Sequence, residues 1–193
     1  NLQASLRAQS AICDSPAAIL HRVNRQLHAA TDSMHFATVF LAFLDPASRR
    51  LVYCSGGHDA PVLLRADGTL RTLTEGGLPV GAFDFGTYGE EEVVLEDGDL
   101  LLLYTDGLTE TRRPDADEEF GAGRLGDFLR AHGDLDVCDL LPQLDTELQR
   151  FRGRREADDD ITLVALKVAE ACRDRRSARA RAGAAATPSE EAP

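Results

Sequence analysis

Two groups of acidic residues, far apart in the chain, could bind a metal ion together. Asp106 closely follows an apolar run, Leu100 to Tyr104, that is bounded by Asp-Gly pairs on both sides. Such a run is typical of a short strand that is buried on both faces. The second group is the triplet Asp158 to Asp160, which leads directly into another β-branched, apolar segment. Carboxylates held beside two buried strands could converge on one hard cation.

The acidic triplet has an electrostatic cost that a cation would remove. Three adjacent carboxylates repel one another, and we expect the buried strand beside them to limit the solvation of at least one. Carboxylate oxygens are hard ligands, which favour magnesium, manganese or calcium over zinc or copper. Magnesium or manganese with water on its other positions suits a site that handles phosphate.

Several other roles for Asp106 can be compared with this one. An Asp-Gly pair is most often only a turn former, so the position alone is weak support. A phosphatase with a nucleophilic aspartate needs a second aspartate two residues on, and Leu108 stands there. The ligand spacing of an EF-hand and the Gly-rich loop of P-loop nucleotidases are both absent. Hydrolysis by metal-activated water, without a protein nucleophile, is the chemistry that remains.

Bulk composition favours one globular domain. The 193 residues are 43% hydrophobic, which is enough for a core. The net charge of −12 argues against a nucleic-acid partner. The four cysteines are scattered, with no Cys-x-x-Cys spacing, so neither a zinc site nor a disulfide scaffold is expected. We find no signal peptide and no long apolar stretch, which predicts a cytoplasmic protein with no membrane segment here.

Hydrophobic periodicity predicts helices in two blocks with strands between them. The expected helices are the end of one over Asn1 to Gln9, one from the Asp14-Ser15-Pro16 start to about Ala30, then Phe120 to Ala131 and Val137 to Phe151. The expected strands are Phe36 to Leu44, Arg50 to Ser55, Val62 to Arg65, Leu70 to Leu73, Leu78 to Phe83, Glu92 to Glu96, Leu100 to Tyr104 and Ile161 to Val168. Strands grouped in this way predict an α+β layered fold.

The two ends of the chain differ from the rest. Asn1 to Ser10 already has a helical pattern and no initiator methionine, which indicates the cut edge of a longer protein. Residues 1–168 form the predicted domain. From residue 169 the sequence is rich in Ala and Arg and has no apolar period, which predicts a disordered tail over 169–193.

Five motifs in order resemble bacterial PPM-type (2C-like) serine/threonine protein phosphatases of the SpoIIE type. They span nearly everything from Leu2 to Val168. The longest is Leu101 to Glu110, with the sequence LLLYTDGLTE. The others are Ser55 to Pro61 (SGGHDAP), Leu78 to Gly81 (LPVG), Phe120 to Leu125 (FGAGRL) and Asp159 to Leu163 (DDITL).

The resemblance implies an α-β-β-α sandwich, with antiparallel sheets flanked by helices and a binuclear manganese or magnesium centre at one end. A metal-bridging water would attack a phosphoserine or phosphothreonine in line. Carried over by position, Asp106 and Asp159 are metal ligands, with Asp160 as the second choice to Asp159. Gly107 would allow close approach of the backbone beside the site. The implied substrate is a phosphorylated anti-sigma-factor antagonist, and the implied regulator is a sensor domain upstream.

The departures from the family pattern are as informative as the matches. Two upstream ligand segments of the family, a Gly-Asp segment and an Asp-Val-x-Gly-His-Gly segment, do not occur here. We therefore expect half a metal centre and a sandwich that lacks its early strands. The main alternative is a degenerate phosphatase fold that acts as a protein-binding regulatory module. A third interpretation is an acidic metal-binding domain without hydrolysis.

Three basic residues near the motifs have two interpretations each. His58 lies in a Gly-rich loop and could act as a general acid, although a hydrogen bond within its own turn is the simpler role. Arg112 and Arg113 follow Glu110 and could attract a phosphorylated partner, or could simply lie on a solvated face. The Phe120 to Leu125 motif is expected to anchor a flap over the cleft.

Overall fold

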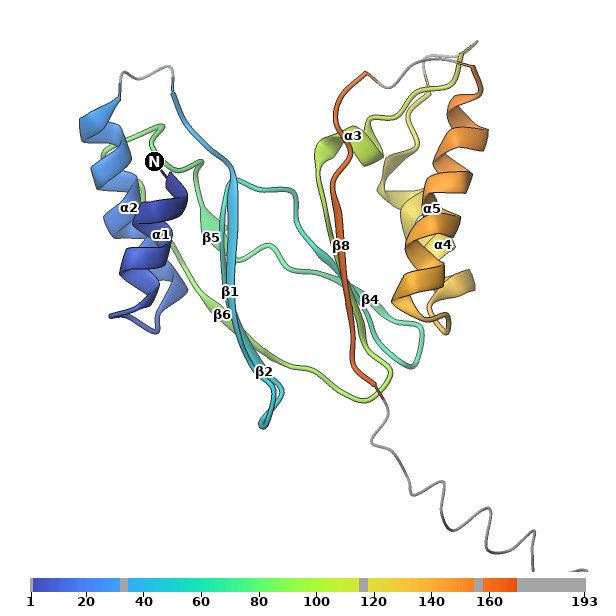
Figure 1. Cartoon of the computed structure of the whole chain (residues 1–193), viewed down its shortest axis with the longest axis horizontal. Helices are drawn as coiled ribbons and strands as arrows, with labels where there is room; N and C mark the ends of the chain where they lie inside the picture. The colour runs from blue at the N-terminus through green and yellow to red at the C-terminus, as the bar shows by residue number, and fades with distance from the viewer. Residues whose placement is uncertain (1, 32–34, 115–117, 155–157, 170–193) are drawn as a thin grey trace, which may run out of the picture.

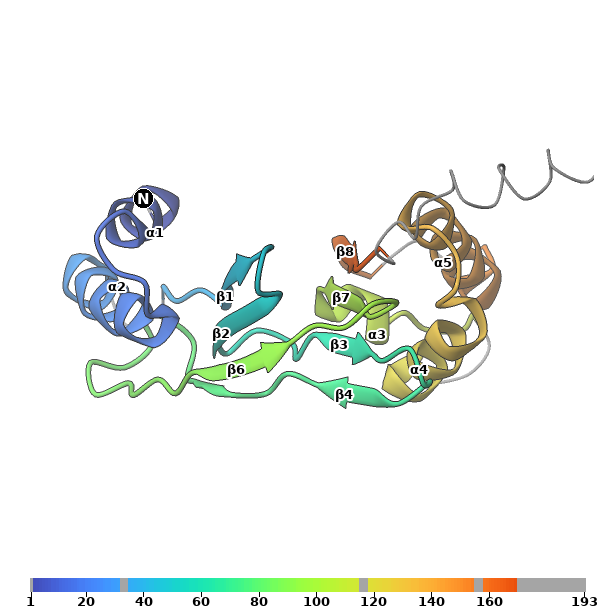
Figure 2. The same ribbon diagram turned by 90° about the horizontal axis from the view of Figure 1, so that it is seen from below.

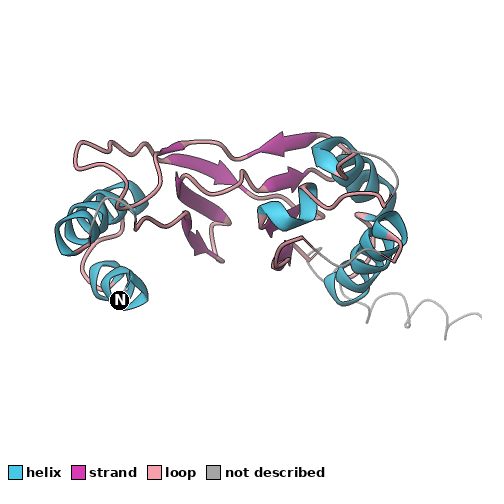
Figure 3. Cartoon of the chain, turned by 90° about the horizontal axis from the view of Figure 1, so that it is seen from above, coloured by secondary structure: helices cyan, strands magenta, loops and turns pink. Residues whose placement is uncertain are grey.

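Two β-sheets lie between two pairs of helices in the computed structural model (Figure 1). The structure describes residues 2–31, 35–114, 118–154 and 158–169. Helices α1 and α2 lie at one end and α4 and α5 at the opposite end, as the perpendicular view also shows (Figure 2). The strands occupy the space between them (Figure 3). The predicted α-β-β-α order is confirmed.

The first helical layer begins where the sequence predicts it. Helix α1 covers Leu2–Ser10 and helix α2 covers Pro16–Ala30. The Ser15 side chain caps α2 by accepting a hydrogen bond from the Ala18 N–H, and Pro16 occupies the first turn. The buried stripe of α2 packs on the first sheet and contains Ile19, Leu20 and Val23.

The first sheet contains β1 (Val39–Asp45), β2 (Arg50–Gly56), β5 (Gly76–Gly77) and β6 (Glu91–Val94). Strands β1 and β2 form the predicted antiparallel hairpin, in register from Val39 opposite Gly56 to Asp45 opposite Arg50. On its other side β2 pairs with β6 in antiparallel fashion and with β5 in parallel. Among the described residues, β1 pairs only with β2 and is therefore an outer strand of this sheet.

The second sheet has the order β4-β3-β7-β8 and is antiparallel throughout. Its strands are β3 (Val62–Leu64), β4 (Leu70–Thr72), β7 (Leu100–Tyr104) and β8 (Leu163–Lys167). The pairing of β7 with β8 sets Tyr104 opposite Leu163. It thereby brings the two acidic groups of the sequence to the same end of the sheet.

Alternating side chains of β7 serve two different cores. Leu100, Leu102 and Tyr104 point toward helices α4 (Gly121–His132) and α5 (Val137–Arg152). Leu101 points the other way, into the core between the two sheets, where it joins Tyr53 of β2. The expectation of a strand buried on both faces is confirmed, and this double burial holds the end of β7 firmly in place.

The structure corrects one predicted strand and adds one helix. Leu78 to Phe83 is not a strand: only Val80 pairs, in an isolated bridge with Ala37. Pro79 has no N–H for a sheet, and Gly81 turns the backbone with φ 92°. The new helix is α3 (Asp106–Thr109), one helical turn after the end of β7. The Asp-Gly pair at its start had suggested a non-helical turn.

The remaining expectations concern the chain ends and membranes. The predicted tail over 169–193 lies outside the described residues except for Ala169. No helix in the described part of the chain is long and apolar enough to cross a membrane. The described cysteines, Cys13, Cys54 and Cys138, are free thiols.

Candidate metal centre

Asp106 begins the single helical turn that follows β7. Its carboxylate accepts a hydrogen bond from the Gly107 N–H (2.9 Å), and its main-chain carbonyl accepts one from the Glu110 N–H (2.8 Å). The side chain is exposed, whereas Gly107 and Leu108 are buried. The turn is therefore anchored by its buried residues, and the Asp106 carboxylate faces solvent.

Thr105 ties this turn to the acidic triplet. Its hydroxyl donates to the Asp160 carbonyl oxygen (3.1 Å) and accepts from the Thr162 N–H (3.0 Å). Its own N–H donates to the Thr162 carbonyl (3.2 Å). On the triplet side, the Asp159 carboxylate accepts from the Asp160 N–H (2.7 Å). These bonds keep the two acidic segments side by side although more than fifty residues separate them along the chain.

Gly107 is the point of closest approach between the two segments. A Cβ atom built there would lie 2.7 Å from the Asp160 carbonyl oxygen and 3.4 Å from that of Asp159. The first distance is shorter than real side chains tolerate, so only glycine fits without a shift of one backbone. The structure thus contains the close backbone approach that the resemblance implied for this position.

A pocket of about 310 Å³ opens beside this junction. It is lined by Gly107, Glu110, Arg112, Asp158 and Asp159. Asp106 and Asp160 are neighbours of these residues in the chain and do not line the pocket themselves. Glu110 is the lining residue that sequence reasoning missed. Its position four residues after Asp106, on the same side of a helical turn, was the available signal.

The carboxylates of the two acidic segments are exposed, which corrects one expectation. Asp106 and the triplet Asp158 to Asp160 all reach solvent, because they lie outside the strands, Asp106 after the end of β7 and the triplet before the start of β8. The predicted loss of solvation is therefore absent, and mutual repulsion is the remaining electrostatic cost of bringing them together.

The carboxylate ligands of the two acidic segments suit a divalent cation chemically, but too few of them are brought together to bind one on their own. Carboxylate oxygens are the ligands that magnesium and manganese prefer. However, within the described ranges no group of three or more His, Cys, Asp or Glu side chains is arranged to hold a metal ion. The described residues can therefore supply part of a metal centre only.

His58 does not belong to this pocket. The Ser55 hydroxyl accepts from the His58 N–H (3.2 Å) and donates to the His58 carbonyl (3.1 Å), which closes the Gly-rich turn. The His58 side chain is half-buried and is not among the residues that line the pocket. The arrangement favours a structural role for this turn over general acid catalysis.

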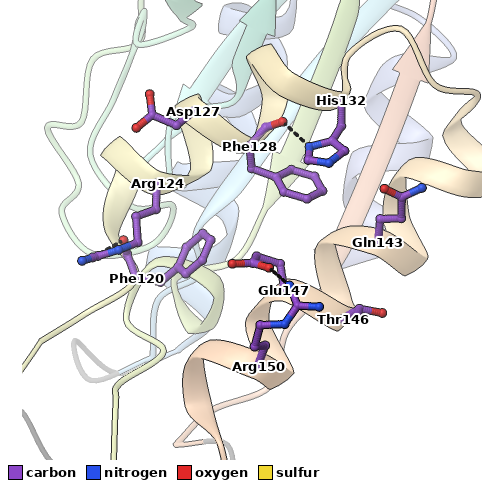
Figure 4. A pocket seen from close by; sticks show the side chains of 9 residues that line it. All are labelled: Phe120, Arg124, Asp127, Phe128, His132, Gln143, Thr146, Glu147 and Arg150. Carbon is purple, nitrogen blue, oxygen red and sulfur yellow. Dashed lines mark hydrogen bonds and ion pairs between the residues drawn. The ribbon is translucent and has the colours of Figure 1, made fainter.

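A larger pocket, of about 530 Å³, lies between α4 and α5 and is drawn in Figure 4. Its charged side chains are already paired with each other or with neighbours: Glu147 with Arg150 at 2.7 Å and Asp127 with Arg130 at 3.1 Å. His132 hydrogen-bonds the Phe128 carbonyl (3.0 Å). Because these groups satisfy one another, this pocket is a weaker candidate for chemistry than the smaller acidic one.

Solved structures with the same fold define the class of the domain. The SiaA-PP2C domain of Pseudomonas aeruginosa matches with a TM-score of 0.74 and 23% identity, covering 86% of this chain and 67% of that one. RsbX, solved in complex with magnesium, matches with a TM-score of 0.57 and 16% identity, covering 85% and 69%. The layered sandwich is therefore a PP2C-type fold.

Sequence comparison then places the chain within one family. The family of stage II sporulation protein E (SpoIIE) matches residues 1–169, and the chain belongs to it. The phosphoserine phosphatase RsbU of Bacillus subtilis is 31% identical over 160 residues, 79% of this chain and 45% of that protein. Protein IcfG of Synechocystis is 31% identical over 137 residues, 70% of this chain and 21% of that protein. The chain thus spans less than half the length of either relative.

Proposed function

We propose that the chain is the catalytic domain of a metal-dependent protein phosphatase that hydrolyses phosphoserine or phosphothreonine. The observation that carries the proposal is the junction at Gly107, where a PP2C-type fold holds the Asp106 turn against the Asp159–Asp160 backbone at an acidic pocket. Membership of the SpoIIE family and the name of the relative RsbU, a phosphoserine phosphatase, support the same activity.

In this proposal Asp106 and Asp159 are two ligands of the metal centre, and Asp160 is the alternative to Asp159. A bound manganese or magnesium ion would neutralise phosphate charge and activate water. The chain itself contributes rigid placement: the Thr105 hydrogen bonds and the close contact at Gly107 keep both carboxylates in register before a metal arrives. Rigid placement lowers the cost of gathering two like charges at one site.

The proposed substrate is a phosphoserine on an anti-sigma-factor antagonist, and the proposed regulator is a sensor domain elsewhere in the natural protein. The relatives RsbU and IcfG are both much longer than the matched region, which is compatible with additional domains. The proposed location is the cytoplasm.

The first experiment is turnover by the natural full-length protein. Hydrolysis of an aryl phosphate and of a phosphoserine peptide would be measured in manganese, with Asp106→Asn as the variant and Asp127→Asn, an exposed carboxylate on α4, as the charge-matched control. We expect manganese-dependent turnover that Asp106→Asn abolishes and Asp127→Asn retains. A folded, metal-loaded protein without turnover would contradict the proposal.

A second candidate function is a protein-binding regulatory module built on the same fold. One observation favours it: the described residues do not contain a group of three metal-ligating side chains. This candidate predicts binding of a partner protein with unchanged affinity in Asp106→Asn and in the presence of a chelator. The same turnover experiment separates the two candidates.

A further inference from the structure

Arg112 is the only cationic residue among the described residues that line the acidic pocket. The other charged residues of its lining are Glu110, Asp158 and Asp159. The whole chain carries a net charge of −12, so its overall field repels a phosphate group. A phosphate group that reaches this pocket therefore needs a local cation, and the guanidinium group is the side chain best suited to a phosphate.

The position of Arg112 is fixed relative to Asp106 by a short chain of hydrogen bonds. The buried Thr111 hydroxyl donates to the Gly107 carbonyl (2.7 Å), and the Phe120 N–H donates to the Thr111 carbonyl (2.8 Å). Arg112 then pairs with Glu119 across an antiparallel bridge. The segment of residues 111–113, which carries Arg112, is thus attached to the same helical turn that carries Asp106, the proposed metal ligand.

Arg113 lies in the same segment, and its side chain points away from the acidic pocket. Consecutive side chains of an extended segment point to opposite faces. The Arg113 guanidinium lies 4.9 Å from the ring centroid of Phe151 on α5 and pairs with Glu118 at 3.4 Å. It is not among the pocket-lining residues. Of the two neighbouring arginines, Arg112 therefore faces the pocket and Arg113 faces helix α5.

Glu119 already forms an ion pair with Arg112, for which a phosphate group would have to compete. The Arg112 Nη2 atom lies 2.8 Å from the Glu119 Oε1 atom, and both side chains are partly exposed, at 42% and 46%. An exposed pair of this kind contributes little to stability, so its exchange for another anion costs little. A phosphate dianion accepts two parallel hydrogen bonds from a guanidinium group and has the greater charge.

We propose that Arg112 binds the phosphate group of the phosphoprotein substrate and exchanges its contact with Glu119 for that phosphate. This inference rests on the proposed phosphatase function, whose metal ligands it leaves unchanged. Arg112 would hold the phosphate beside Asp159, while Glu119 would screen the guanidinium group until a substrate arrives. The pocket would thereby select a phosphorylated side chain over a carboxylate.

The test is binding of a peptide whose phosphoserine is replaced by a non-hydrolysable phosphonate analogue. Fluorescence anisotropy would follow the labelled peptide on the natural full-length protein in manganese, with Arg112→Ala, Arg113→Ala and Glu119→Gln. Arg112→Ala should weaken binding about tenfold or more. Arg113→Ala should stay within about twofold of the parent, because it keeps the pocket-facing charge.

Glu119→Gln gives a result in the opposite direction. Removing the Glu119 carboxylate, one competitor for the Arg112 guanidinium group, should tighten phosphonate binding by about two- to fivefold, as expected when a weak ion pair is lost. If the Arg112–Glu119 pair were purely structural, both variants would weaken binding. If Arg112→Ala does not fold, Arg112→Lys replaces it. This variant keeps the positive charge but loses the bidentate guanidinium geometry, so its affinity for the phosphonate should be lower than that of the parent.

The outcomes separate this inference from the proposed function. Loss of phosphonate binding in Arg112→Ala alone supports the role of Arg112, even if the parent shows no manganese-dependent hydrolysis, in which case only the phosphatase proposal fails. Normal hydrolysis of phosphoserine peptide together with unchanged binding in Arg112→Ala overturns the role of Arg112 and leaves the phosphatase proposal intact. Equal losses in Arg112→Ala and Arg113→Ala, or no binding to the parent, also overturn it.

Discussion

In the proposed metal centre, the exposed carboxylate of Asp106 would lower stability without metal and bind the cation when it is present. It is exposed at the start of α3, beside the equally exposed acidic segment of Asp159. The pair repels in the absence of a cation, and solvent screens that repulsion strongly. In the proposed centre the same two charges would attract a divalent cation.

Asp106→Asn is therefore expected to have opposite effects on stability and on metal affinity. Without metal, the free energy of unfolding should rise by a few tenths of a kcal/mol at low salt, because repulsion is relieved. Manganese affinity should fall by about tenfold or more, because a charged ligand is lost. Thermal melts in chelator and a manganese titration measure the two effects.

Asp127→Asn is the control for this pair of measurements. It removes one negative charge from an exposed position of α4, away from the acidic pocket. It should leave manganese affinity unchanged. A loss of metal-free stability in Asp106→Asn, or an equal loss of affinity in both variants, would contradict a shared site at Asp106 and Asp159.

Gly107 offers a test of the contact between α3 and the acidic triplet. In Gly107→Ala the new Cβ would lie 2.7 Å from the Asp160 carbonyl oxygen, so one backbone must move. We expect a loss of about 1–3 kcal/mol in the free energy of unfolding and weaker manganese binding. Chemical denaturation and metal titration measure these effects.

Gly123→Ala is the matched substitution. Gly123 lies in α4, and a Cβ there meets nothing within 4 Å. Because alanine favours the helix, this variant should gain up to about 1 kcal/mol. If both alanine variants change stability by the same amount and sign, the close approach at Gly107 has no energetic meaning.

The second sheet and the α4–α5 pair are joined at the C-terminal end of β8. Lys167, which ends this strand, donates from Nζ to the Gly133 carbonyl (2.7 Å) and to the Leu135 carbonyl (2.8 Å). These carbonyls belong to the connection between the two helices. The one lysine of the chain thus donates hydrogen bonds to carbonyl groups that lie beyond the C-terminal end of α4 and have no partner within that helix.

Lys167→Met should lower the free energy of unfolding by about 1–3 kcal/mol, because two charge-assisted hydrogen bonds disappear while the aliphatic stem is kept. Chemical denaturation of the full chain measures the change. Arg130→Met, which removes an exposed ion pair with Asp127 on α4, should change it by no more than about 0.5 kcal/mol. Similar losses in the two variants would show that the Lys167 bonds contribute nothing specific.

Several groups that ionise at high pH are buried in or beside the first sheet. Burial raises the pKa of Cys54 to about 12 and that of Tyr88 to about 12. Burial, followed by a hydrogen bond from its hydroxyl to Glu91 (2.6 Å), raises the pKa of Tyr53 to about 12. Glu91 also pairs with Arg71 of the second sheet at 2.7 Å. Through Glu91, the Tyr53 hydroxyl and the Arg71 guanidinium group connect the first sheet with the second.

The pH dependence of stability follows from the sign of these shifts. The folded pKa values exceed the unfolded ones, about 9 for the thiol and 10 for the phenols, so the neutral forms are favoured by folding. Their contribution is complete below about pH 9 and is lost as pH rises toward 12. Denaturation between pH 8 and 11 should show falling stability. Tyr53→Phe should make the fall above pH 10 shallower, and an unchanged slope would contradict the assignment.

Local sequence patterns determined much of this protein, including helix α2 with its Ser15 cap, the β1–β2 hairpin, the doubly buried β7 and the acidic residues themselves. Each depends on interactions within a few residues or on burial that the apolar period records. The family resemblance added the layered order. The Leu78 to Phe83 strand was wrong for the same local reason: an apolar run cannot reveal whether partner strands exist for it.

Only the tertiary structure decided what the acidic residues are next to. The pairing of β7 with β8 brings the Asp106 turn onto the Asp159–Asp160 backbone, and Gly107 makes the contact close enough to exclude any side chain. Neighbouring arginines in the sequence, Arg112 and Arg113, were separated onto opposite faces by the bridge to Glu119. These relations depend on contacts between distant segments, which the strand register sets and local propensity does not encode.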